Sequence, residues 1–444
     1  DGNNYNTAVG HEAGKLVTIG IQNTLIGGLA GDAITDADFN VAVGYEALTN
    51  NVLGSRSTAL GRSALNAQNP ASAADMYNVA VGFNTGTAVT TGIENTLIGG
   101  LAGDALTDAD YNVALGSAAL SSDTLGNRAT ALGTFALFSQ NFQSATDNYN
   151  VAVGYAAGNV ITTGIQNTLI GGLAGDAITD ADYNVALGYS SLTTNQLGSK
   201  STAIGTFSLN NQNPASATDM FNTAVGYAAG GVVTTGVHNT LVGGLAGDAL
   251  TTGGSNVLIG YSTGTYGANL TTGSGNVLIG PYTDSTTAGG NQAHGLGYNL
   301  DCAPSYTTLG NNASDIRAAH GVATWATVSD QRYKKDIVDS TAGLSFINAL
   351  QPRTFKYKTL GELPETFSAY EADSTEVFKN SDTNHGFIAQ EIKAAIDADS
   401  SIADGFKLWD DREDGSQEVA EAALIPILVK AIQELTARIE TLEG

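Results

Sequence analysis

A short pattern of polar, aliphatic and glycine positions recurs along the first 310 residues. Its unit is Asn or Ser, then Thr or Val, Ala or Leu, an aliphatic residue and Gly, as in NTAVG (6–10), NTLIG (23–27) and NVAVG (40–44). β-Branched and aliphatic residues bounded by Gly, Asn and Asp favour a short strand followed by turns. The pattern therefore predicts many short strands at a fixed interval.

The spacing of the closing glycine defines the repeat. This glycine stands at positions 10, 27, 44, 61, 82, 99, 116, 133, 154, 171, 188, 205, 226, 243, 260, 280, 297 and 310. The steps are 17, 17, 17 and 21 residues, repeated three times, and then 17, 17, 20, 17 and 13, so a 72-residue super-repeat contains 17-residue units. One unit, with two short strands and two turns, buries too little apolar surface to fold alone. Stacked units predict a β-solenoid shaft over residues 1–310.

The repeats resemble a known family of surface proteins. NTAVGYAAG, NVAVGYEAL and STAIGTFSL are similar to the head repeats of YadA-type trimeric adhesins and to repeats in bacteriophage tail fibres. The resemblance implies parallel β-rolls packed as a trimer. The adhesin unit is shorter, nearer fourteen residues, so an intertwined trimeric β-helix remains an alternative winding.

The repeat stops at Gly310, and a transition over 311–328 precedes a second domain, 329–444, with another pattern. Within it, GLSFINAL (343–350) predicts a short helix and RTFKYK a strand. HGFIAQEIKAAI (385–396) predicts a strand that leads into a helix, and the Asp-Gly pair at 414–415 is typical of a hairpin turn. We therefore expect a mainly β protein whose shaft is followed by a small α+β domain.

The last segment, 424–444, predicts an amphipathic helix. Its apolar residues are spaced as a heptad seam, and they are Ile425, Leu428, Ile432, Leu435, Ile439 and Leu442. Such a seam packs either on its own domain or against copies of itself. The alternation of Ile and Leu does not determine the number of strands, and the trimeric resemblance favours a three-stranded coiled coil.

Composition excludes several classes of protein. A formal net charge of −25 argues against nucleic acid and anionic membranes as partners, because both require basic patches. No apolar run approaches the ~20 residues needed to cross a bilayer, so membrane insertion is not expected. DGNNYNTAVG lacks the basic start and apolar core of a signal peptide. The chain begins inside a repeat, so we expect a further N-terminal region.

Acidic loops recur on the shaft. The first contains Asp32, Asp36 and Asp38, and similar loops follow in the next two super-repeats. Clustered carboxylates are what Ca²⁺ requires. Their spacing lacks the fixed ligand pattern of an established motif, so we favour solvated loops and expect no cofactor, with Ca²⁺ as the alternative.

The 21-residue units contain a four-residue extension. Extra residues in a solenoid form loops on one face, which is often a binding face. Polar and aromatic side chains in these loops are candidates for binding a host receptor, and they are Gln68, Asn69, Gln140, Asn141, Phe142, Gln212 and Asn213. A spacer that corrects the twist of the coil is an equally good interpretation.

The second domain resembles one family over roughly 329–444. SDQRYKKDI, GLSFINALQPRTFKYK, HGFIAQEI and ALIPILVKAIQEL follow in the order found in the C-terminal intramolecular chaperone domain of phage tail spikes and fibres, the endosialidase type. The resemblance implies a domain that trimerises, drives folding of the preceding β-fibre and then cuts itself off with a serine–lysine dyad.

Carried onto this sequence, the family motif implies Ser329 as nucleophile, Lys334 as general base and cleavage of the Val328–Ser329 bond. A lysine can act as a base when burial and neighbouring cations favour its neutral form. Arg332 and Lys335 are the neighbouring cations. Asp330, Arg332, His385 and Gln390 occupy motif positions and are candidates for supporting the site. Without the resemblance, we would favour a Ser-Asp pair that caps a turn beside a solvated or trimer-facing basic patch, because a serine and a lysine five residues apart are a weak signal.

The resemblances favour a trimeric phage tail fibre or spike that attaches to a host surface. They imply a location in the virion tail after synthesis in the host cytoplasm. The expected partners are two further copies of the chain, a host glycan or protein receptor, and other tail proteins through the N-terminal region. The alternatives are a bacterial trimeric adhesin, which would need a membrane anchor after the coiled coil, and a polysaccharide-degrading spike, which would need paired carboxylates in a groove. We expect no anchor after Gly444, and no aspartate set has a convincing partner, so the fibre is favoured.

Overall fold

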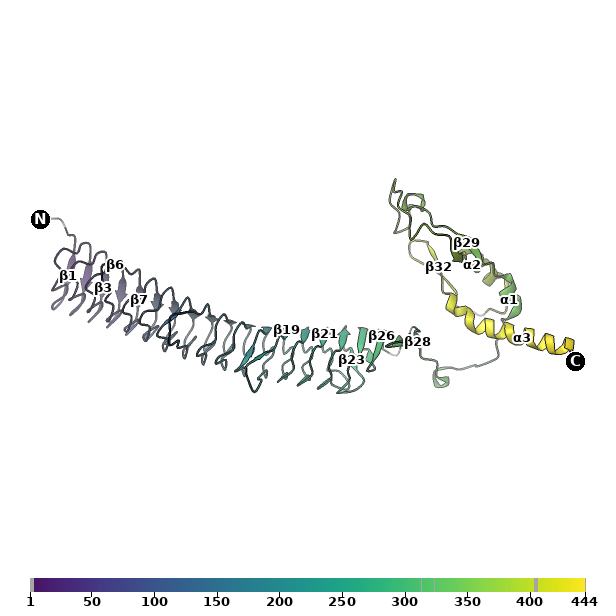
Figure 1. The fold of residues 1–444 in the computed structure, drawn as a ribbon, viewed down its shortest axis with the longest axis horizontal. Helices are drawn as coiled ribbons and strands as arrows, with labels where there is room; N and C mark the ends of the chain where they lie inside the picture. Colours follow the sequence, from purple (N-terminus) through teal and green to yellow (C-terminus); the bar gives the residue numbers. More distant parts are fainter. Residues whose placement is uncertain (1–3, 313, 323, 403–405, 444) are drawn as a thin grey trace. The chain divides into compact units, whose positions relative to one another are not determined.

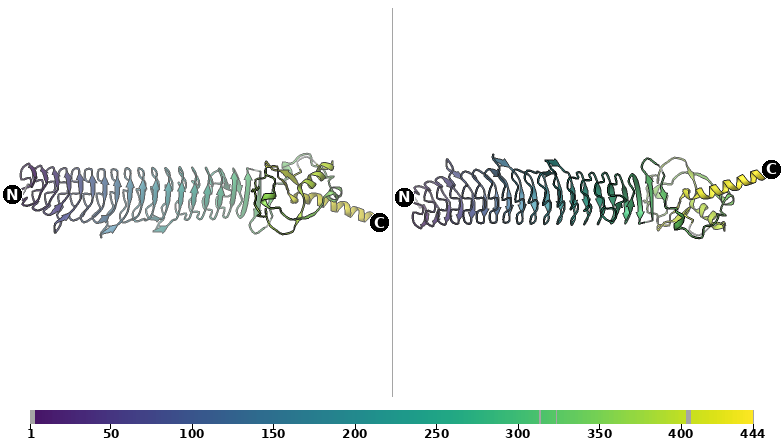
Figure 2. Two further views of the ribbon diagram at one scale, coloured as in Figure 1. Left: turned by 90° about the horizontal axis from the view of Figure 1, so that it is seen from above. Right: turned by 90° about the horizontal axis from the view of Figure 1, so that it is seen from below.

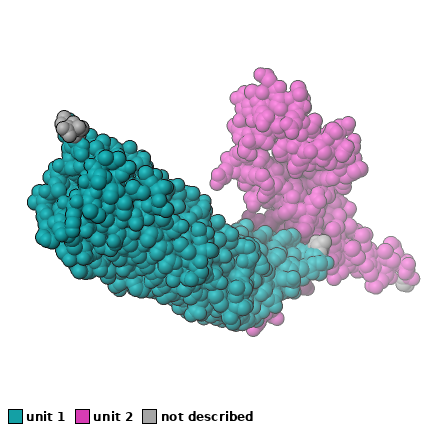
Figure 3. Space-filling model, turned by 60° about the vertical axis from the view of Figure 1, so that its left-hand side comes forward, with its two compact units in different colours: residues 1–328 teal, residues 329–444 magenta. Residues whose placement is uncertain are grey.

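The computed structural model describes residues 4–312, 314–322, 324–402 and 406–443. The chain separates into two compact units, Asp1–Val328 and Ser329–Gly444 (Figure 3). The first is the shaft and the second is the α+β unit.

The shaft is a parallel β-solenoid in which each turn contributes one short strand to a long sheet, three residues long up to β22 and longer in the last two turns (Figure 1). Strand β2 (Thr24–Ile26) pairs in parallel with β1 (Thr7–Val9) on one side and β3 (Val41–Val43) on the other. The same register continues through β5 (Thr58–Leu60), β7 (Val79–Val81), β8 (Thr96–Ile98), β9 (Val113–Leu115), β11 (Thr130–Leu132), β13 (Val151–Val153), β14 (Thr168–Ile170), β15 (Val185–Leu187), β17 (Thr202–Ile204), β19 (Thr223–Val225), β20 (Thr240–Val242), β21 (Val257–Ile259), β22 (Val277–Ile279), β24 (His294–Tyr298) and β26 (Tyr306–Asn311).

This arrangement confirms the predicted mainly β solenoid. Each strand pairs with the next one along the same chain, so the turns stack within a single chain. Intertwined chains would instead pair strands between copies. The prediction of two strands in every unit is wrong, because most turns contain one strand and close through residues with positive φ.

The core of the shaft contains an alanine or a leucine from the middle position of each three-residue ladder strand from β2 to β22. This residue points inward and is fully buried, as in Leu25, Ala42, Ala59 and Leu97. The neighbouring strand positions face outward, as the two-residue period of a strand requires. The Thr-Ala-Val and Thr-Leu-Ile pattern of the sequence is therefore one buried residue between two outward ones.

The closing glycine is required by the close approach of successive turns. Gly44 has φ +139°, and a Cβ atom placed on it would lie 2.4 Å from the carbonyl oxygen of Gly61. Gly27 has φ +133° and the same relation to Gly44. A larger residue would clash with backbone, which explains why this position recurs as glycine in the sequence.

A ladder of buried asparagines explains why most repeat units begin with asparagine. Asn23 Oδ1 accepts the backbone N–H of Asn40, and Asn23 Nδ2 donates to the Ala37 carbonyl. Asn40 repeats both bonds one turn further on, with Ser57 N–H and the Gly54 carbonyl. Buried backbone groups need partners, and the asparagines supply them between turns.

The 21-residue units form small arms that project from the side of the shaft (Figure 2). Each arm is a two-stranded parallel pair, and the three are β4 (Gly54–Ser55) with β6 (Ala74–Asp75), β10 (Gly126–Asn127) with β12 (Thr146–Asp147), and β16 (Gly198–Ser199) with β18 (Thr218–Asp219). A similar pair, β23 (Asp284–Ser285) with β25 (Asp301–Cys302), lies near the end of the shaft. The parallel ladder then gives way to β27 (Ser314–Ala319) and β28 (Ala326–Thr327), which pair antiparallel.

The second unit combines short helices with two antiparallel strand pairs. The elements are η1 (Gln331–Tyr333), α1 (Leu344–Ala349), β29 (Arg353–Phe355), η2 (Leu360–Glu362), β30 (Asn384–Gly386), α2 (Ala389–Ala398), β31 (Trp409–Asp411), β32 (Gln417–Val419), η3 (Glu421–Leu424) and α3 (Ile425–Glu443). Strand β29 pairs with β30, and β31 pairs with β32 through the predicted turn at 414–415. Phe346, Ile392, Leu408 and Ile427 form the core between the helices.

Helix α3 presents two different apolar faces. Ile427 and Ala431 are buried against the unit. The heptad residues lie on another face and are exposed, with Ile432 at 61% and Ile439 at 53% of their full surface. The seam therefore does not pack on its own domain. No helix in the described parts of the chain is both long and apolar enough to span a bilayer.

Candidate active site

A tight turn at the start of the second unit brings Ser329 and Lys334 together. Asp330 caps helix η1, because its Oδ1 accepts the backbone N–H of Arg332 at 2.8 Å. The backbone N–H of Lys334 then donates to the Gln331 carbonyl at 2.9 Å and ends the turn. The chain folds back within six residues, so the lysine side chain returns to the serine.

The resulting contact is a direct one between the two predicted catalytic side chains. Lys334 Nζ donates to Ser329 Oγ at 2.6 Å. A general base must lie within hydrogen-bond reach of the proton that it removes, and this pair meets that requirement. Ser329, Lys334 and Val328 are all exposed to solvent in the single chain.

Arg332 forms an ion pair with Asp330 within the same turn. Its guanidinium pairs with Asp330 through Nε and Nη2, at 3.0 Å to Oδ1 and 2.7 Å to Oδ2. These hydrogen bonds hold the pKa of Asp330 below its usual value. The charge of Arg332 is therefore balanced by Asp330, and its effect on Lys334 stays a prediction. Asp330 also caps the turn.

The other two supporting candidates lie elsewhere in the unit. His385 is the middle residue of β30, opposite Thr354 of β29, and Gln390 is exposed at the start of α2. His385 lines an open pocket of about 650 Å³ with Arg353 and Glu421. The residues that line this pocket do not include Ser329 or Lys334.

A comparison with protein families bears on the same segment. Residues 329–399 match the family model for the chaperone of endosialidase. The matched segment begins at Ser329. It covers the dyad, α1, the β29–β30 pair and α2, and it leaves the shaft and α3 outside. Among curated proteins and solved structures, none matches the chain significantly. The chain thus joins a segment similar to the chaperone of endosialidase to a β-solenoid, which has 18 turns in the described residues.

The predicted receptor loops on the shaft are mostly turned inward. Gln68, Gln140 and Gln212 are completely buried, and Phe142 is 5% exposed. Asn69 and Asn213 are exposed, and Asn141 is half-buried. The proposed role of the buried side chains in receptor contact is wrong.

The asparagine ladder gives the physical reason. Ser57 replaces asparagine in the first long unit, and Gln68 Oε1 accepts from both Ser57 Oγ and Asn78 Nδ2, at 3.1 and 3.0 Å. Gln212 does the same for Ser201 and Asn222 in the third long unit. The extension therefore supplies an amide where the ladder lacks one.

Of the three candidate calcium ligands, Asp38 binds the backbone of the preceding turn. Asp38 Oδ1 accepts the backbone N–H of Ile21 in the preceding turn at 2.7 Å, while Asp36 is exposed and Asp32 is half-buried. Its copy Asp110 binds Ile93 N–H in the same way, and burial raises the pKa of Asp110. No group of three or more His, Cys, Asp or Glu side chains that could bind a metal occurs among the residues described by the structure.

Sequence reasoning missed an ion pair within the segment that matches the family model. Arg353, at the start of β29, binds Glu391 of α2 through Nε and Nη2 at 3.0 and 2.7 Å. The pKa of Glu391 is lowered by these bonds. The only signal in the sequence was that both residues lie in the motif blocks, 38 positions apart.

Proposed function

We propose that the protein is the shaft of a trimeric bacteriophage tail fibre or spike, folded by its own C-terminal chaperone. The observation that carries this proposal is the Ser329–Lys334 contact at the first residue of the chaperone segment, directly after the end of the β-solenoid. The assembled fibre would belong to the tail of a virion and attach it to a receptor on the host surface.

Two exposed apolar surfaces of the single chain support assembly with further copies. On the shaft, the third residue of each strand faces outward, and Ile26, Leu60, Leu115 and Leu187 are 38–46% exposed. Monomeric proteins rarely expose apolar patches larger than a few hundred Å², and this row runs along the whole sheet. On α3, the heptad seam is exposed as well. Both surfaces suit parallel contact with identical chains.

The number of chains is proposed as three from the family likeness. Ile and Leu alternate in the seam, and that pattern alone is also compatible with two strands. The expected mass of the trimer is about 136 kDa, three times the 45.2 kDa chain.

The dyad would cut the chain at the junction of the two units. Lys334 removes the proton of Ser329 Oγ, which attacks the carbonyl carbon of Val328. The acyl group moves from the Ser329 nitrogen to Oγ, and the freed amine takes up the proton. Water then hydrolyses the ester, which leaves a carboxylate on Val328 and restores the Ser329 hydroxyl. The net reaction is hydrolysis of one peptide bond, once per chain.

Assembly of the chains would start this reaction. A lysine acts as a base only in its neutral form, and exclusion of water disfavours an ammonium ion. Lys334 is exposed in the single chain, so burial of the turn by neighbouring copies would activate it. Cleavage would then follow trimerisation and release the finished shaft.

The test compares the full-length chain with Ser329→Ala and Lys334→Met on a denaturing gel. Release of the 116-residue fragment 329–444 from the parent and from neither variant is expected. Lys335→Met is the matched control, since it removes the adjacent cation and leaves the dyad intact, and it should still cleave. Fragments from all four proteins, or from none, would refute self-cleavage by this dyad.

A further inference from the structure

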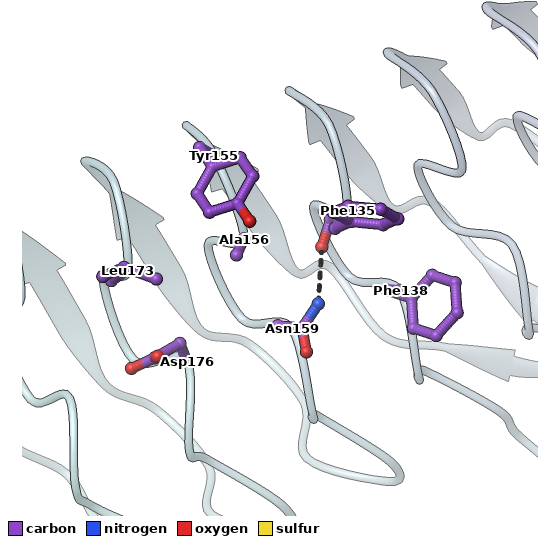
Figure 4. Close-up of a pocket in the computed structure, with 7 residues that line it drawn as sticks. All are labelled: Phe135, Phe138, Tyr155, Ala156, Asn159, Leu173 and Asp176. Atoms are coloured by element: carbon purple, nitrogen blue, oxygen red, sulfur yellow. Dashed lines mark hydrogen bonds between the residues drawn. The ribbon is translucent and has the colours of Figure 1, made fainter.

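An open aromatic pocket lies on the side of the shaft, where the second super-repeat meets the third. Its volume is about 390 Å³, within the range of small-molecule sites. Three successive turns line it, with Phe135 and Phe138 from the first, Tyr155 and Asn159 from the second, and Leu173 and Asp176 from the third (Figure 4).

The rings form two edge-to-face pairs rather than a closed cage. Phe135 and Phe138 lie 5.6 Å apart between centroids, and Phe135 and Tyr155 lie 6.2 Å apart, both in T-shaped geometry. Phe135 and Tyr155 remain 37% and 59% exposed. Ring surface left open to solvent in this way can stack against the C–H face of a sugar ring.

Two polar side chains accompany the rings. Asn159 Nδ2 donates to the Phe135 carbonyl at 3.3 Å, and its amide retains an acceptor oxygen and a second N–H for a ligand. The Asp176 carboxylate is half-buried, accepts from Thr193 Oγ1, and has its pKa raised by burial. A carboxylate in a chain of net charge −25 repels anions, so the pocket suits neutral hydroxyl groups.

Two residues of the pocket, Phe138 and Asn159, depart from the repeat, whereas the Phe135–Tyr155 pair recurs as Phe207 and Tyr227. The residues that match Phe138 in the other two super-repeats are Asn66 and Asn210, whose side chains donate to the Glu46 and Ser190 carbonyls of the preceding turn. Asn159 likewise matches Thr87 and Gly231. The corresponding turns therefore fold without an aromatic ring at this position, where Phe138 is half-buried.

We infer that this pocket binds a neutral saccharide of the host surface, with Phe138 and Tyr155 stacking on a sugar ring and Asn159 and Asp176 binding its hydroxyl groups. The inference rests on the proposed attachment function and names the ligand class for it. Quaternary ammonium groups also bind aromatic side chains, through cation–π contacts. The two T-shaped ring pairs do not enclose a cation on several sides, which favours the saccharide.

The test uses an array of neutral hexose and N-acetylhexosamine oligosaccharides, uronic-acid oligosaccharides and a choline conjugate, probed with the full-length protein. Binding to a neutral oligosaccharide is expected. Phe138→Asn should weaken that binding about tenfold or more, since one aromatic contact is lost. This variant carries the residue that the sister turns already contain, so it should fold normally.

Tyr227→Ala is the matched control. Tyr227 is the copy of Tyr155 in the next super-repeat, where Asn210 and Gly231 replace the pocket residues, and this variant should bind as the parent does. Unchanged binding by Phe138→Asn, preference for the acidic or choline probe, or no binding to any probe would each overturn the inference.

Light scattering on the same samples separates this inference from the proposed function. A trimer that cleaves normally but binds no neutral glycan overturns the pocket alone. A monomer overturns the proposed function as well.

Discussion

Removal of one rung of the asparagine ladder should loosen the shaft locally. Asn167 is completely buried. Its Nδ2 donates to the Ala181 carbonyl at 2.9 Å, and its Oδ1 accepts the Asn184 backbone N–H at 3.0 Å. Asn167→Ala leaves both backbone groups buried without these partners, at about 1–3 kcal/mol each. The expected loss of local stability is about 2–6 kcal/mol.

The solenoid confines this effect to neighbouring turns, because each turn contacts only the next. Hydrogen–deuterium exchange measured by mass spectrometry is therefore the appropriate assay. Peptides that contain Asn184 should exchange at least about thirtyfold faster in Asn167→Ala than in the parent. Peptides that cover β20 should be unchanged. The exposed Gln143 supplies the control, and Gln143→Ala should leave all rates as they were.

The chain contains an internal comparison for this prediction. Ala129 already occupies a ladder position, and there Asn148 Oδ1 accepts the Asn150 N–H at 2.9 Å, while Gln140 Oε1 accepts from Asn150 Nδ2. Asn148→Ala should therefore lower the local stability of its turn as much as Asn167→Ala does. Exchange rates at Asn184 that do not change would refute the view that the ladder stabilises the stack.

Three further predictions concern pH, the coiled coil and the turn glycine. Burial raises the pKa of Asp284 to about 6, so the folded state binds its proton more tightly than the unfolded state does. The protonated carboxyl therefore adds to the free energy of unfolding below pH ~4, and this contribution, no more than about 3 kcal/mol, is lost as the pH rises through about 6. Hydrogen–deuterium exchange near β23 should become faster over this pH range, and Asp284→Asn should abolish the pH dependence. Ile432→Lys places like charges in the exposed seam and should give a 45.2 kDa monomer that cleaves poorly. The control Glu440→Lys lies outside the seam and should behave as the parent does in light scattering and on the denaturing gel. Gly44→Ala should destabilise β3 and β5 by on the order of 1–3 kcal/mol, because its Cβ meets the Gly61 carbonyl; equal urea midpoints for parent and variant would contradict that account.

The fold of the shaft could be predicted because its signal is repeated eighteen times. The spacing of Gly27, Gly44 and Gly61 gives the turn length, and the single buried residue between two outward ones gives the strand. The inward orientation of the Gln68 side chain could not be predicted, because the four-residue extension interrupts the 17-residue period there. Its side chain points inward to bind Ser57, eleven residues earlier, which stands where the ladder otherwise has an asparagine. The ladder itself can be recognised only when the turns are stacked.

The site was predictable in part for a similar reason. Ser329 and Lys334 meet through a local turn, and the Asp-x-Arg sequence that caps it lies between them. The pairing of Arg332 with Asp330 was not predicted, because the sequence does not show which way the two side chains point within the turn. The aromatic pocket was missed, although an alignment of the super-repeats shows Phe138 where the other two have asparagine.

The central claim is that the second unit assembles three shafts through surfaces that a single chain leaves exposed. Its most direct test is the mass of the full-length Ser329→Ala protein in solution, measured by light scattering after size-exclusion chromatography, since this variant keeps both units joined. The account predicts a particle of about 136 kDa, three times 45.2 kDa. A stable, folded monomer of 45.2 kDa at micromolar concentration would contradict it.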